Sequence, residues 1–108
     1  GMRDRKAVME DRADGFIAMP GGFGTLDELL EIVTLKQLRY HAKAVVILDV
    51  GGYYDHLLAQ FKRMFEEGFA KHKYRELYHV TADPADALAH IETYEPAVDW
   101  PDKADKIG

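Results

Sequence analysis

The fold of this chain is decided by residues 15–28, which read GFIAMPGGFGTLDE. Residues 15–19 form an apolar run that predicts a buried strand, and the apolar residues from Leu26 onward recur at helical spacing. Three glycines between a strand and a helix let the backbone approach a ligand closely. The start of the helix adds unpaired N–H groups and the positive end of a dipole. This arrangement predicts a turn that binds a phosphate group.

The elements downstream continue the alternation of strands and helices. Residues 44–50 (AVVILDV) are almost continuously apolar, which is typical of a strand covered on both faces of a parallel sheet. Gly51-Gly52 predicts a turn, residues 53–69 predict a helix, and residues 77–81 predict a third strand. Asp83 and Pro84 predict the N-cap and first residue of a last helix, with an inward stripe of Ala87, Leu88 and Ile91.

Two further helices complete the predicted pattern. The charged residues 2–13 predict a short helix before the first strand, and the helix after the glycines is expected from about Leu26 to Tyr40. The apolar residues of this second helix cover more than one face, which is typical of a helix buried on several sides. In so small a domain one of those sides is expected to meet another subunit, so the sequence predicts a homodimer.

This order of elements predicts an α/β fold with right-handed crossovers. We expect a three-layer, Rossmann-like parallel sheet, truncated to about three strands flanked by four helices. Because sheets average five or six strands, residues 1–94 resemble one half of such a domain. Residues 95–108 are rich in proline, aspartate and lysine and predict a loosely ordered tail.

Composition narrows the classes of partner. The 108 residues suffice for one domain, and a net charge of −5 argues against a nucleic-acid-binding protein. The longest apolar run, residues 44–48, is too short to cross a membrane. The chain has no cysteine, which suits a reducing compartment, so we expect a cytoplasmic protein. Its five histidines lack the spacings of common metal sites, and no metal is predicted.

Two motifs carry a resemblance to a known family. Residues 20–28 (PGGFGTLDE) match the PGGxGTxxE motif of the Lonely Guy family at every specified position. Residues 2–6 (MRDRK) resemble its MHxRK element, with Arg3 in place of the histidine. The resemblance covers roughly residues 2–94, and it implies an additional N-terminal half with its own glycine-rich turn.

The resemblance also implies an activity. Members of this family are phosphoribohydrolases that cleave a nucleoside 5′-monophosphate, such as a cytokinin riboside monophosphate or AMP, to free base and ribose 5-phosphate. No cofactor is implied, although an older label of the family is lysine decarboxylase. Glu28 and Arg5 are the implied catalytic residues, and Lys6 is a further substrate contact. The phosphate is implied to bind the amides of Gly21, Gly22, Gly24 and Thr25.

The same residues have structural interpretations. Thr25 and Glu28 also form a capping box, in which Glu28 would accept a hydrogen bond from the Thr25 amide. Arg5 and Lys6 would then belong to a solvated helix face, and Tyr53 and Tyr54 would serve packing rather than stacking on a base. The main functional alternative is a non-catalytic phosphate- or nucleotide-binding module, and a purely structural partner of another chain leaves the intact motif unexplained.

Overall fold

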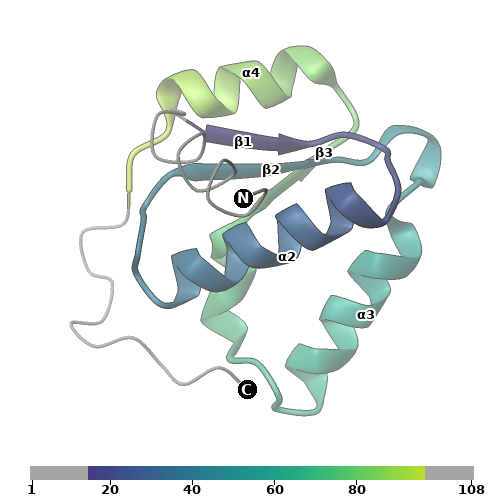
Figure 1. Ribbon diagram of the computed structural model, residues 1–108, viewed down its shortest axis with the longest axis vertical. Helices are drawn as coiled ribbons and strands as arrows, with labels where there is room; N and C mark the ends of the chain where they lie inside the picture. The colour runs from purple at the N-terminus through teal and green to yellow at the C-terminus, as the bar shows by residue number, and fades with distance from the viewer. Residues whose placement is uncertain (1–14, 97–108) are drawn as a thin grey trace.

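The computed structural model describes residues 15–96 of the chain (Figure 1). The first helix, predicted at residues 2–13, lies outside this range, and so does the tail predicted at residues 95–108 except for its first two residues. The described elements follow in the order β1 (Gly15–Ala18), α2 (Phe23–Gln37), β2 (Ala44–Leu48), η1 (Val50–Gly52), α3 (Asp55–Glu66), η2 (His72–Leu77), β3 (His79–Thr81) and α4 (Pro84–Thr93). No helix within residues 15–96 is both long and apolar enough to cross a membrane.

The three strands form one parallel sheet in the order β1-β2-β3. Gly15 pairs with Ala44 on one side of β2, and Val46 pairs with His79 on the other. Every residue of β2 is buried, which agrees with its continuous apolar sequence. The predicted α/β class and the parallel sheet are therefore confirmed.

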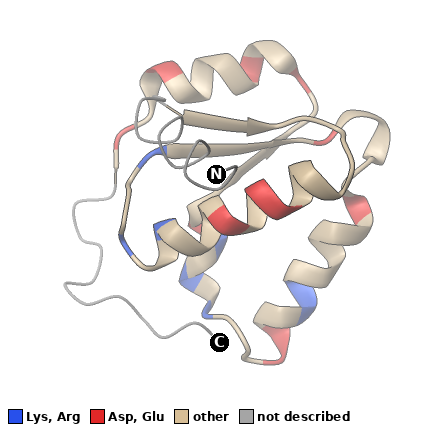
Figure 2. Cartoon of the chain, viewed as in Figure 1, with Lys and Arg blue, Asp and Glu red and all other residues tan. Residues whose placement is uncertain are grey.

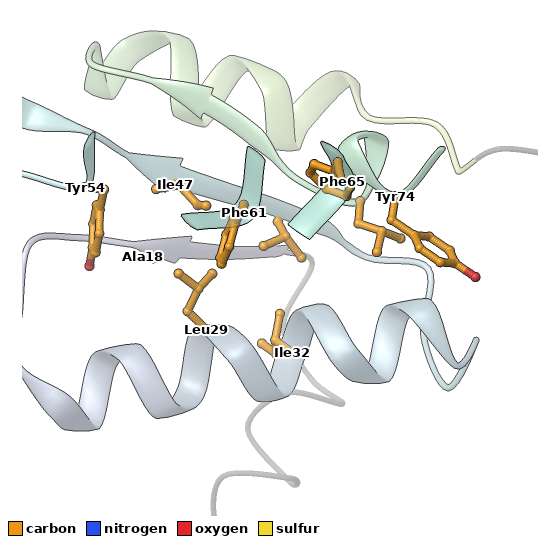
Figure 3. Packing of buried hydrophobic residues seen from close by; sticks show 10 residues of the cluster. Ala18, Leu29, Ile32, Ile47, Tyr54, Phe61, Phe65 and Tyr74 are labelled. Atoms are coloured by element: carbon orange, nitrogen blue, oxygen red, sulfur yellow. The ribbon is translucent and has the colours of Figure 1, made fainter. Parts of the chain in front are cut away.

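The sheet separates two apolar cores because side chains alternate between its faces. Val45 and Ile47 pack with residues of α2 and α3, including Leu29 and Phe61 (Figure 3). Val46 and Leu48 of β2 form a second cluster with Ala87 of α4 on the opposite face. Figure 1 shows the resulting layers, with α4 on one side of the sheet and α2 and α3 on the other.

Two predicted helix ends were wrong. The helix α3 stops at Glu66 because Gly68 adopts a positive φ of 78°. The N–H of Phe69 then bonds to the carbonyl of Met64, and the N–H of Gly68 bonds to that of Phe65, which is a Schellman motif. The helix α2 ends at Gln37 rather than Tyr40 by the same pattern, with Arg39 at φ 68°.

Three other details of the prediction were also wrong. Phe69 lies beyond α3 and is exposed, and Leu88 of α4 points to solvent rather than inward. Leu77 belongs to η2, so β3 begins two residues later than expected, although Leu77 is buried as an apolar residue should be. The predicted cap of α4 is confirmed, because the Asp83 carboxylate accepts a hydrogen bond of 3.0 Å from the N–H of Ala85.

Candidate functional site

The glycine-rich turn joins the carboxyl end of β1 to the start of α2. Gly22 is the N-cap of the helix, with an extended backbone at φ −100° and ψ −152°. The N–H of Leu26 makes a 3.1 Å bond to the carbonyl of Gly22. The amides of Phe23, Gly24 and Thr25 precede this bond in the first turn of the helix, where an N–H has no intrahelical acceptor. These amides and the helix dipole together suit an anion.

The helix begins three residues earlier than predicted. Gly24 was expected in the turn, but a glycine is readily accommodated in the first turn, where the helix is only partly hydrogen-bonded. Thr25 therefore occupies the third helical position, and Gly22 is the residue with the non-helical backbone that an N-cap requires. The capping box of Thr25 and Glu28 is wrong, because Thr25 lies inside the helix.

Gly21 is required by a close approach. A Cβ atom on this residue would lie 2.3 Å from the Thr25 hydroxyl oxygen and 2.9 Å from the Thr25 Cβ. The Thr25 side chain thus packs directly on the backbone of the turn. Cβ atoms on Gly22 and Gly24 would meet no described atom within 4 Å, so the backbone on their side is open to a ligand.

Glu28 lies one helical turn after Thr25. Residues three positions apart are neighbours on one helix face, with Cβ atoms about 5–6 Å apart. The partly buried Glu28 is thus on the same face as the Thr25 side chain, which contacts the turn. Figure 2 shows acidic residues along the first part of α2 and a basic residue near its other end, where Lys36 is the basic residue of the last turn. The structure therefore places the Glu28 carboxylate on the helix face that also carries Thr25, one turn after the amides of the helix start.

The turn is also held by two tyrosines that sequence analysis had assigned to packing. The Tyr54 hydroxyl donates a hydrogen bond of 2.5 Å to the Met19 carbonyl, and the Tyr53 hydroxyl donates one to the Gly21 carbonyl. Burial and the neighbouring Tyr53 raise the pKa of Tyr54, so its hydroxyl remains a donor. The sequence placed both tyrosines after the second strand, at the edge of the sheet where the glycine turn also lies. It could not indicate their hydrogen-bond partners, which are main-chain atoms 35 and 32 residues away.

Two carboxylates support the loop that carries these tyrosines. Asp49 accepts a 2.6 Å hydrogen bond from the N–H of Tyr54. The pKa of the Asp55 carboxyl is raised by a hydrogen bond with Asp49 and by the negative charge of Asp49. Gly52, at φ 74°, comes close to the same carboxyl group, since a Cβ there would lie 2.7 Å from Asp55 Oδ2. Gly51-Gly52 makes the predicted turn after the second strand.

Arg5 and Lys6 of the other motif lie outside residues 15–96, and their predicted roles stay predictions. Within the described part of the chain no three histidine or acidic side chains are grouped to hold a metal ion. A cavity of about 260 Å³ opens at the far end of α2, lined by Lys36, Arg39 and His41 among others. It lies away from the glycine turn and brings together none of the predicted site residues that the structure describes.

Comparison with known proteins connects this geometry to a family. A family model described as possible lysine decarboxylase matches residues 1–91. The chain belongs to that family. It is 46% identical over 95 residues to a probable cytokinin riboside 5′-monophosphate phosphoribohydrolase of Oryza sativa subsp. japonica. It is 43% identical over 98 residues to a cytokinin riboside 5′-monophosphate phosphoribohydrolase of Arabidopsis thaliana.

These matches cover most of the chain but only part of each relative. They include 88% of the chain and 39% of the rice protein, and 91% of the chain and 45% of the Arabidopsis protein. The chain therefore spans about two fifths of the length of the relatives it matches. The resemblance to the Lonely Guy family is confirmed, and the glycine turn with the first half of α2 lies inside the matched family region.

Proposed function

We propose that this chain carries the phosphate-binding and carboxylate-bearing part of a phosphoribohydrolase. The reaction is hydrolysis of the N-glycosidic bond of a nucleoside 5′-monophosphate, either a cytokinin riboside monophosphate or AMP, to free base and ribose 5-phosphate. The observation that carries the proposal is the placement of Thr25 and Glu28 on one face of α2, directly after the N-cap Gly22. The names of the relatives support the same reaction.

Each predicted residue has a role in this scheme. The amides of Gly22, Gly24 and Thr25 and the close turn at Gly21 hold the 5′-phosphate at the helix start. Cleavage of the glycosidic bond builds positive charge on the ribose ring. The Glu28 carboxylate stabilises that charge or activates the attacking water. Arg5 orients the substrate or the carboxylate, and Lys6 adds a contact, by analogy with the family motif.

A second candidate function is a phosphate- or nucleotide-binding module without turnover. One observation favours it. The chain spans only about two fifths of the length of its relatives, yet it contains all the helix-start amides that are proposed to bind the phosphate. The two candidates differ in Glu28, which only the hydrolase requires.

The test is incubation with AMP and with a cytokinin riboside monophosphate, followed by chromatography of free base and ribose 5-phosphate. The hydrolase predicts release that Glu28→Gln lowers at least about 100-fold, the usual scale for losing one catalytic acid or base. Asp27→Asn removes a neighbouring charge from the same helix and should leave release within a few-fold. Binding of AMP without release supports the module, and the absence of binding contradicts both.

We also propose that the chain forms a homodimer through α2 and α3. A groove of about 240 Å³ between these helices is lined largely by apolar side chains, and Leu30 and Phe69 at its rim are exposed. A second copy of the chain would cover them. Light scattering should give twice the chain mass, and Phe69→Glu should shift it toward the monomer. A monomeric wild-type chain contradicts this proposal.

The compartment proposed is the cytoplasm, supported by the absence of cysteine from all 108 residues. Cell fractionation with an antibody against the chain tests this location. Recovery in a membrane or secreted fraction would contradict it.

A further inference from the structure

The glycine-rich turn receives support from a loop that the family motif does not contain. Two hydrogen bonds link the β2–α3 loop to main-chain carbonyls of the β1–α2 connection. Tyr54 donates to Met19, and Tyr53 donates to Gly21. In Figure 3 the Tyr54 ring stands beside the end of β1, with its hydroxyl oxygen on the α2 side of the sheet. The turn is thus held from a neighbouring βα unit.

The supporting loop is itself firmly attached. Tyr54 is only 5% exposed, and its ring meets that of Tyr53 edge to face, with centroids 5.0 Å apart. The N–H of Tyr54 bonds to the Asp49 carboxylate at 2.6 Å, and the N–H of Asp49 bonds to the Thr81 carbonyl at 2.8 Å. Because Thr81 ends β3, these contacts join the carboxyl ends of all three strands.

The bond from Tyr53 acts on a peptide unit that could otherwise rotate. The Gly21–Gly22 peptide has a glycine on each side, and glycine adopts conformations closed to other residues. In a trans peptide the N–H points opposite to the carbonyl. If this peptide unit rotated by half a turn, the Gly22 N–H would point away from a bound anion and the Gly21 carbonyl would point toward it. A carbonyl dipole there would repel a phosphate.

We propose that Tyr53 is a positioning residue for the phosphate site, and that its hydroxyl holds the Gly21–Gly22 peptide with the Gly22 N–H directed to the anion. This inference rests on the proposed function and adds a residue outside the PGGxGTxxE motif. Tyr54 secures the preceding Met19–Pro20 peptide, which has no N–H to offer. Its role is to anchor the turn, whereas Tyr53 selects which group of the turn faces the ligand.

A different role for Tyr53 would be stacking on the base, since 53% of the residue is exposed. The substitution Tyr53→Phe separates the two, because it keeps the ring and removes the hydroxyl. Tyr40→Phe is the matched control, because Tyr40 is exposed and lies beyond the far end of α2, away from the glycine turn. The probes for titration calorimetry are ribose 5-phosphate, which has no base, and adenosine, which has no phosphate.

We expect Tyr53→Phe to weaken the binding of ribose 5-phosphate about 3- to 10-fold, the range for one hydrogen bond. The affinity for adenosine should not change. In the ligand-free protein, NMR should show new exchange broadening at the Gly22 amide, while the thermal midpoint stays near that of Tyr40→Phe. Equal affinity of wild type and Tyr53→Phe for ribose 5-phosphate would overturn this inference alone. A wild-type chain that does not bind ribose 5-phosphate would overturn the proposed function as well.

Discussion

Lys36 provides a test of how the α/β core tolerates a buried charge. The residue is 7% exposed at the end of α2, where its Nζ donates a 3.0 Å hydrogen bond to the Leu77 carbonyl. The same Nζ lies 4.6 Å from the centre of the Tyr94 ring. Burial lowers the pKa of Lys36 from 10.5 to about 8. Protonation of this amine therefore destabilises the folded protein relative to the unfolded chain.

The sign and size of the effect follow from these two pKa values. Between about pH 8 and about pH 10.5 the unfolded chain binds more protons than the folded protein, so the free energy of unfolding rises with pH. Below this window both states are protonated and the full penalty applies, at most about 3 kcal/mol. Solvent near the ammonium reduces it to about 1–2 kcal/mol. We expect a gain of roughly 1 kcal/mol from about pH 7 to about pH 9.5.

The assay is urea unfolding followed by far-ultraviolet circular dichroism across that pH range. Wild type and Lys62→Met, which changes an exposed lysine of α3, should show the same rise. Lys36→Met should lose that part of the rise, because its side chain does not titrate. If Lys36→Met gains as much stability with pH as Lys62→Met does, the assignment of the rise to Lys36 is refuted.

Substitutions at three further residues test other parts of the fold. Leu29→Ala should lower the free energy of unfolding by about 2–5 kcal/mol in urea, because Leu29 is fully buried between α2 and the sheet. Asp83→Ala should lower the free energy of unfolding by about 1 kcal/mol in the same assay, because it removes the N-cap of α4. Asp83→Asn should keep most of that stability, because asparagine is also a good N-cap. Burial and the nearby His79 lower the pKa of His90, so the unfolded chain binds more protons and stability should fall as pH drops below about 6.5. His90→Gln should reduce that loss, and an unchanged acid limb would contradict this assignment.

The strands and the last helix could be predicted because their signals are local. A continuous apolar run identified β2, and the Asp83-Pro84 pair identified the start of α4. The glycine motif located the turn between β1 and α2 for the same reason, since a strand, a turn and a helix follow each other within residues 15–28.

The features that were missed depend on distant or subtle contacts. Arg39 at φ 68° ends α2, although few residues other than glycine adopt this conformation. Burial of Lys36 depends on η2 and Tyr94, which lie some 40 to 60 residues further along the chain. The bonds of Tyr53 and Tyr54 end on carbonyl groups, which every residue has, so no pattern of side chains indicates them.

The central position of β2 has a consequence for how the chain folds. Because β1 and β3 each pair with β2 and not with one another, neither half of the sheet can form without this one five-residue strand. Each pairing also closes a crossover of about thirty residues, and such separated contacts slow folding. Substitutions in β2 should therefore slow refolding as well as lower stability, whereas substitutions in β3, which can add to a β1–β2 nucleus, should act mainly on the unfolding rate.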